Sequence, residues 1–139
     1  MDQFSTFDVA RIFSVDRTRL QTWLDKDFFS PNEKARGKGT KAIFTLNDLY
    51  RLQLFLYGLE LFGSRNQAKS FPHIEFEAVG PGKGQFQYFA YTLYRGKPLL
   101  RKGELLKQGG IPHMTEDKVA VFLINLQTVK AEVDQLLRA

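Results

Sequence analysis

Few residues of this 139-residue chain have the types and spacing that catalysis or metal binding requires. Cysteine is absent, which excludes disulfides, thiolate nucleophiles and iron–sulfur clusters, and the only histidines are His73 and His113. Glu75 and Glu77 share one side of an alternating segment, where a solvated face explains them better than a hydrolytic carboxylate pair does. Residues 80–84, Gly-Pro-Gly-Lys-Gly, lack the Lys-Ser/Thr ending of a phosphate-binding loop and are typical of a turn. We therefore expect no enzyme, no cofactor and no metal site.

Residues suited to binding lie in the first third of the chain, on a helix expected at residues 16–26. Its apolar positions, Leu20, Trp23 and Leu24, have the i, i+3, i+4 spacing of a buried stripe, and Trp23 is expected in the core. Arginine can read guanine and glutamine can read adenine in the DNA major groove. The expected exposed side carries Arg17, Thr18, Arg19, Gln21 and Thr22.

A basic, glycine-containing segment follows and is typical of an exposed hairpin tip, with residues 42–44 as its returning strand. Such a loop can lie along phosphates or enter the minor groove. Each feature alone is common on solvated surfaces, but their succession favours nucleic-acid binding. The cations of this segment, opposed only by Glu33, are Lys34, Arg36, Lys38 and Lys41.

Local capping signals define the helices that must position these side chains. Ser5 or Thr6 starts a short first helix, with Asp8 in its first turn, and Asp16 starts the second. Residues 45–48, Thr-Leu-Asn-Asp, have the form of a capping box and begin a third helix that ends before Gly63. One or two further helical turns are expected over residues 65–70.

The pattern changes to strands after residue 70. Residues 73–79 alternate like a strand, 85–94 and 98–106 predict two more, and 118–125 is apolar on both faces, which favours a central strand. A terminal helix follows from Leu126. Because residues 85–94 are apolar on both faces, they need cover from this helix, the N-terminal half, a second subunit or a ligand in an aromatic pocket.

Composition limits the class of protein only broadly. The length suits one domain or two small ones, and a net charge of +5 favours an anionic partner weakly. No apolar run approaches the roughly 20 residues that span a bilayer, and no signal-peptide pattern is visible at the N-terminus. A cytoplasmic protein without membrane contact is the expectation.

Residues 4–20, FSTFDVARIFSVDRTRL, resemble the opening helix-turn-helix of MerR-type transcription regulators. Residues 28–31 stand where that family has a Gly-Leu-Leu-x-Pro stretch, and residues 44–49, FTLNDL, are similar to its Tyr-Thr-x-x-Asp-Leu signature. The resemblance covers about residues 3–70. It implies a winged helix-turn-helix with recognition helix 16–26, a wing at 31–44, and Arg51 as a contact to the DNA backbone.

Three departures separate the chain from an ordinary member of that family. Ala42 replaces the usual wing arginine, leaving only Lys41 as a substitute, and Asp27 replaces a glycine. The long dimerisation helix expected after residue 70 is replaced by the strand-rich segment. Effector chemistry, including cysteine-based metal sensing, is therefore not transferred, and any small-molecule effector is unknown.

The sequence thus predicts an α+β protein: a winged helix-turn-helix at residues 1–70, then a small antiparallel sheet with a C-terminal helix at residues 71–139. The first domain is expected to bind double-stranded DNA as a transcriptional regulator, and the second to serve dimerisation or ligand sensing. A homodimer is expected because one short recognition helix covers little DNA, and the helix from Leu126 could supply the contact. The alternative is a protein–protein adaptor that keeps the helix-turn-helix fold and binds a partner through exposed aromatic strands.

Overall fold

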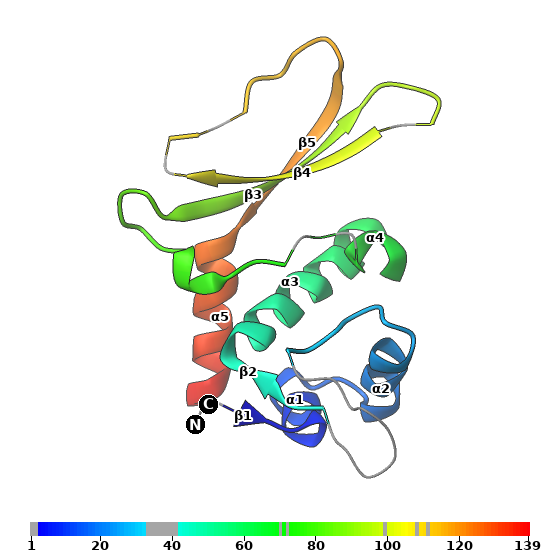
Figure 1. Ribbon diagram of the computed structural model, residues 1–139, viewed down its shortest axis with the longest axis vertical. Helices are drawn as coiled ribbons and strands as arrows, with labels where there is room; N and C mark the ends of the chain where they lie inside the picture. The colour runs from blue at the N-terminus through cyan, green and yellow to red at the C-terminus, as the bar shows by residue number, and fades with distance from the viewer. Residues whose placement is uncertain are drawn as a thin grey trace. The chain divides into compact units, whose positions relative to one another are not determined.

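The computed structural model describes residues 3–32, 42–69, 71, 73–98, 100–107, 109–110 and 112–139 (Figure 1). Within these residues the chain is α+β, with five α-helices, one 3₁₀ helix and two small antiparallel sheets. The chain divides into two compact units, which are treated one at a time. The N-terminal unit comprises Met1–Ile74 with Glu132–Ala139, and the sheet unit comprises Glu75–Ala131.

Helices dominate the N-terminal unit. Its elements are β1 (Gln3–Phe4), α1 (Thr6–Phe13), α2 (Arg17–Asp25), β2 (Phe44–Thr45), α3 (Leu46–Phe62) and α4 (Arg65–Lys69). β2 pairs antiparallel with β1, with Phe4 opposite Phe44. The returning strand expected at residues 42–44 is therefore found as β2, at residues 44–45. Its described partner is β1, near the N-terminus of the chain.

The helix starts follow the predicted caps. The Ser5 hydroxyl accepts a hydrogen bond from the Asp8 N–H at 3.1 Å, and the Asp8 carboxylate accepts one from the Ser5 N–H at 3.0 Å. These Ser5 bonds hold the pKa of Asp8 below its usual value. The Asp16 carboxylate accepts from the Thr18 N–H at 2.8 Å and so caps α2. These local predictions are confirmed.

The inner side of α2 is fixed in an aromatic core. Leu20 and Trp23 are fully buried. The Trp23 ring meets the Phe55 ring of α3 edge-on, with centroids 5.2 Å apart, and Phe29 stacks on Phe44 at 6.3 Å. Such rings contribute large buried area and favour one orientation. The expectation that Trp23 belongs to the core is confirmed.

The sheet unit contains η1 (Phe76–Ala78), β3 (Phe86–Tyr94), β4 (Leu100–Lys107), β5 (Lys118–Asn125) and the first part of α5 (Leu126–Arg138). All pairing is antiparallel, in the order β4-β3-β5. Prediction of residues 118–125 as the central strand was wrong, because β3 lies in the middle and β5 at an edge. The centre of β3 is buried on both faces, as Phe89 and Ala90 show, whereas β5 leaves Leu123 exposed.

The predicted strand at residues 73–79 was also wrong. The structure has a 3₁₀ turn, Phe76–Ala78, and only an isolated bridge between Val79 and Phe86. A 3₁₀ turn places side chains i and i+3 on one side, so Phe76 and Val79 are both buried while Ala78 is exposed. The Lys130 ammonium donates to the carbonyls of Phe76 and Val79 at 3.0 and 3.3 Å and stabilises the turn.

The end of α5 belongs to the N-terminal unit. There the Tyr50 hydroxyl donates to the Asp134 carboxylate at 2.5 Å, and the Tyr57 hydroxyl donates to the Glu132 carboxylate at 2.7 Å. Residues 132–139 are thus tied to α3, although the expected division at residue 70 assigned them to the second domain. Among the described residues, no helix combines the length and apolar character needed to cross a membrane.

Candidate nucleic-acid interface

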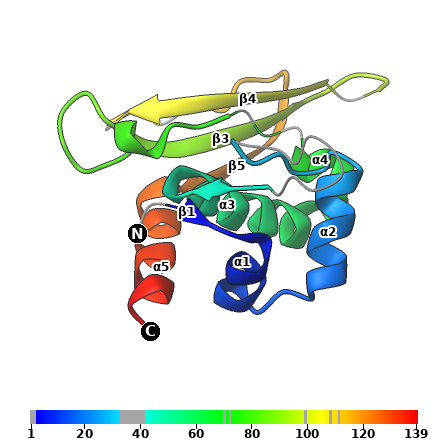
Figure 2. The same ribbon diagram turned by 60° about the horizontal axis from the view of Figure 1, so that its bottom comes forward.

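α2 presents one continuous polar side. Figure 2 shows α2 following α1 across a short turn, and Ser14 makes that turn with a left-handed backbone, φ 53°. The structure brings together on α2 the five predicted side chains: Arg17, Thr18, Arg19 and Gln21, all exposed, and Thr22, half-buried.

Neighbouring groups orient several of these side chains. The Arg17 guanidinium lies over the exposed Phe7 ring of α1 at 5.9 Å, and the Arg19 guanidinium lies over Trp23 at 5.1 Å. Cations over aromatic faces gain about 0.5–1 kcal/mol at exposed sites, which orders the arginines while leaving their donors available.

Two of the polar groups already have intrahelical partners. The Gln21 amide donates to the Asp25 carboxylate at 2.9 Å, so it must exchange that bond to contact a base. The Thr22 hydroxyl donates to the Thr18 carbonyl at 3.0 Å, which leaves its oxygen as an acceptor. Arg17 and Arg19 are therefore the groups on α2 best able to recognise a polar ligand, and Gln21 can join them by exchanging its bond to Asp25.

A groove beside α2 adds a cation that sequence reasoning missed. Arg65, at the start of α4, lies over the Phe28 ring at 4.7 Å and shares with Arg19 the lining of this groove of ≈ 750 Å³. Its other polar lining residues include Thr22, Ser64 and Asn66. Two guanidinium groups beside hydroxyl and amide groups suit an anion such as phosphate. The sequence indicated only a helical turn at residues 65–70, and nothing in that pattern brings Arg65 near Arg19.

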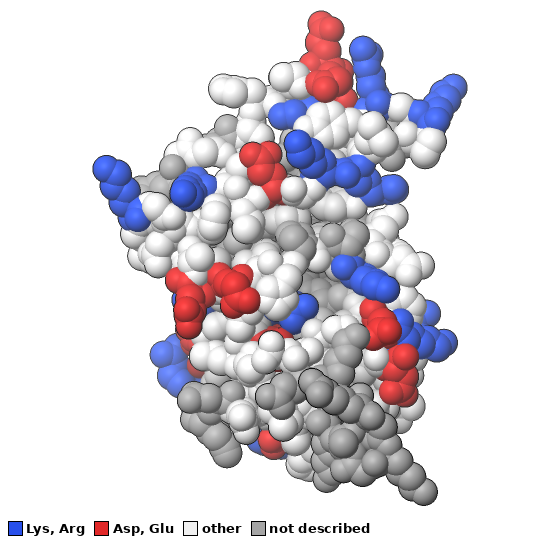
Figure 3. Space-filling view, viewed as in Figure 1, with Lys and Arg blue, Asp and Glu red and all other residues white. Residues whose placement is uncertain are grey.

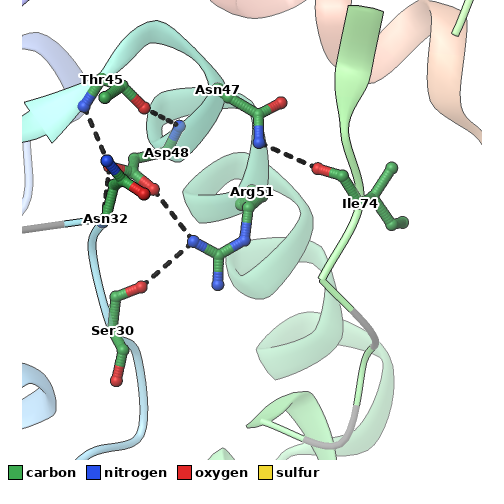
Figure 4. A network of polar contacts seen from close by, with 7 residues as sticks. All are labelled: Ser30, Asn32, Thr45, Asn47, Asp48, Arg51 and Ile74. Carbon is green, nitrogen blue, oxygen red and sulfur yellow. Dashed lines mark hydrogen bonds and ion pairs between the residues drawn. The ribbon is translucent and has the colours of Figure 1, made fainter. Parts of the chain in front are cut away.

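Arg51 has a different position from the surface cations. Its guanidinium donates to the Asp48 carboxylate at 3.0 Å and to the Ser30 carbonyl at 3.1 Å, and only 17% of its side chain is exposed (Figure 4). Asp48, 1% exposed, also accepts from the N–H groups of Thr45 and Asn32 at 2.9 Å each. This network joins residues 30–32 to the start of α3, which are the two sides of the basic segment in the sequence.

The wing cations Lys34, Arg36, Lys38 and Lys41 lie outside the described residues. Their predicted contribution therefore continues to rest on the sequence. Ala42, which stands where the MerR-type pattern has a wing arginine, is buried in the N-terminal unit.

The residues considered for catalysis, metal binding and phosphate binding lie outside α2. Glu75 and Glu77 are exposed, and the described residues contain no group of three or more His, Cys, Asp or Glu able to hold a metal ion. Residues 80–85 form a turn in which the Gln85 side chain accepts from the Gly82 N–H at 2.8 Å. The side chain of Gln85 therefore occupies the concave side of this glycine-rich turn.

Comparison with known proteins identifies no relative. The chain matches no model of a known protein family, and no curated protein matches it. The interpretation of α2 therefore rests on the chemistry of its residues and on the local sequence resemblance described above.

Proposed function

We propose that this protein binds double-stranded DNA and regulates transcription in the manner of a MerR-like winged helix-turn-helix. The observation that carries the proposal is α2: a short helix anchored by buried Leu20 and Trp23, with Arg17, Arg19 and Gln21 along its outer side. A helix of this kind fits the major groove, where arginine and glutamine can make bidentate contacts to guanine and adenine.

The proposed division of labour follows from the partners of each side chain. Arg17 and Gln21 read base edges, each good bidentate contact discriminating by about 1–3 kcal/mol. Arg19 and Arg65, which line one groove, hold a phosphate beside the recognised bases. Arg51 acts indirectly, because its bonds to Ser30 and Asp48 fix the two sides of the basic segment.

The salt dependence of affinity tests the proposal. Log affinity for a 30-base-pair mixed-sequence duplex, measured by fluorescence anisotropy, should fall as log salt concentration rises. Arg36→Ala with Lys38→Ala should make that slope shallower by about 2, because each lost phosphate contact releases about one counterion fewer.

The matched control removes the same charge elsewhere. Arg101→Ala with Lys102→Ala takes two exposed cations from β4 of the sheet unit and should leave the slope unchanged. Absence of salt-dependent binding by the unmodified protein would contradict the proposal. Equal changes of the slope in the two double variants would show that the basic segment at residues 31–44 does not contact DNA phosphates.

An adaptor function is the second candidate, and exposed apolar residues of the sheet unit favour it. Leu100 and Met114 are 66% and 62% exposed, which is high for large apolar side chains. In that case the N-terminal unit would keep its fold without contacting DNA. A protein that binds no duplex at low salt, yet retains its secondary structure, would favour this function.

A further inference from the structure

The two edge strands of the sheet unit differ in how they are protected. Strands at sheet edges invite pairing with other chains, and charged residues normally discourage it. β4 follows this rule: Arg101, Lys102 and Glu104 are exposed along it, and Figure 3 shows basic side chains gathered over the sheet near the turn between β3 and β4.

β5 departs from the rule. Residues 119–125, VAVFLIN, carry no charge, no proline and no glycine, and they are rich in β-branched and aromatic side chains. Among the described strands, β5 pairs only with β3. Val119 and Leu123 are 56% and 48% exposed. β5 is therefore a long, apolar strand at an edge that no described strand covers.

We propose that β5 is the surface through which two copies of this chain associate, by antiparallel pairing of β5 with β5 of a second copy. A two-fold axis at residue 122 would make the interface self-complementary and join the two three-stranded sheets into one of six strands. This inference goes beyond DNA binding, since the association needs no nucleic acid.

The pattern of charge in β5 favours a second copy as the occupant. Residue 122 is the midpoint of the uncharged run, so antiparallel pairing there sets residues 119–125 against residues 125–119. Lys118 then falls outside the paired run, and no charged side chain meets another. A partner strand bearing charges would find none to complement it.

The facing side chains also match. Val121 and Leu123 lie opposite Thr92 and Ala90 of β3, so both point to the same face of the sheet. In the proposed pair, Val121 of each copy lies opposite Leu123 of the other. Apolar side chains that face each other across two strands in this way stabilise their pairing.

The terminal helix is a poorer interface than the sequence suggested. Leu126, Val129 and Val133 of its apolar stripe are already buried within one chain. Leu136 is the one large apolar side chain of α5 with substantial exposure among the described residues, at 38%.

Sedimentation velocity of the full chain without DNA tests the proposal. The unmodified protein should show a concentration-dependent monomer–dimer equilibrium, and Leu123→Lys should weaken it at least tenfold. Leu100→Lys is the matched control, because Leu100 is a more exposed leucine on the opposite edge strand. The control should dimerise normally, and circular dichroism establishes that both variants fold.

A complementation experiment distinguishes pairing from general damage. Val121→Glu and Leu123→Lys should each be monomeric alone, while an equimolar mixture should form a heterodimer through facing opposite charges. Failure of the mixture to associate would overturn the proposal, as would an unmodified protein that stays monomeric at every concentration. Loss of the dimer in Leu136→Lys but not in Leu123→Lys would place the interface on α5 and overturn it equally.

Discussion

Asp48 is the residue on which the polar contacts of the N-terminal unit converge. Its buried carboxylate accepts hydrogen bonds from two backbone N–H groups and from the Arg51 guanidinium. Its capping bond to Thr45 follows from the local Thr45–Asp48 pattern. The bond to the Asn32 N–H, 16 residues away, depends on the tertiary fold and leaves no local pattern.

Substitution Asp48→Asn should destabilise the protein by about 3 kcal/mol, because removing one partner of a buried ion pair leaves the other uncompensated. Urea unfolding measured by circular dichroism checks this value. Asp25→Asn is the control: Asp25 is exposed and, among the described residues, accepts a hydrogen bond from Gln21 alone, so the loss should stay below about 0.5 kcal/mol. Similar losses in both variants would show that the Asp48 network stabilises the protein no more than one exposed hydrogen bond does.

Tyr50 makes the stability of the fold decrease at alkaline pH. Burial, followed by the hydrogen bond to the Asp134 carboxylate, raises the pKa of Tyr50 above its ordinary value of 10.0. The folded state therefore retains a proton that the unfolded chain loses, and stability falls as pH rises above about 10. Contact with Glu132 raises the pKa of Tyr57 in the same direction.

The variant Tyr50→Phe should therefore lose less stability than the unmodified protein between pH 9.5 and 11. Urea unfolding at each pH checks the difference. The phenylalanine variant starts from a lower stability because it lacks the hydrogen bond, so the slopes are compared rather than the absolute values. Parallel slopes would contradict the assigned role of Tyr50.

At the scale of elements, helices were predicted well because their signals are local. Three helices begin at caps made by residues within one turn of the helix start. These caps are Ser5 with Asp8 for α1, Asp16 for α2, and Thr45 with Asp48 for α3. Sheet order could not be predicted in the same way. The apolar character of β5 is compatible with a central or an edge position, and long-range pairing with β3 decides between them.

The turn at residues 76–78 shows a second reason why part of the structure could not be predicted from the sequence. Alternation predicted a strand, but the 3₁₀ turn is stabilised by Lys130, 54 residues from Phe76 in the sequence. The proposed anion groove is similar, since its two arginines, Arg19 of α2 and Arg65 of α4, line the same groove although they lie 46 residues apart in the sequence. The exposed side of α2, in contrast, follows from helical periodicity and was predicted.

Gly58 shows how closely α4 packs on α3. An added Cβ at Gly58 would lie 2.9 Å from the Ala68 Cβ of α4. Gly58→Ala should therefore destabilise the protein by about 1–3 kcal/mol through overpacking, despite the better helix propensity of alanine. Thermal unfolding checks the sign.

A compensating variant makes the Gly58 prediction specific. Adding Ala68→Gly to Gly58→Ala removes the clashing methyl group and should recover part of the loss attributed to it. Simple additivity of the two substitutions would contradict close packing of α3 on α4 at this point.

At the scale of the whole molecule, the two units suggest two tasks. The N-terminal unit carries the exposed arginines of α2, and the sheet unit carries the edge strand β5 with its uncharged run at residues 119–125. As the proposed recognition helix, α2 has nine residues and would reach only a short stretch of DNA, so pairing through β5 would supply a second half-site. The proposed DNA binding and the proposed self-association can be tested separately, because they depend on different residues.

Selection of bound duplexes from a random-sequence pool tests the central claim, that α2 reads DNA bases, most directly. The unmodified protein should enrich a defined site. Arg17→Ala should relax the preference at one position of that site, and Gln21→Ala should relax it at another. Arg101→Ala should recover the same site as the unmodified protein. Recovery of that site by all three variants, or no enrichment by the unmodified protein, would contradict base reading by α2.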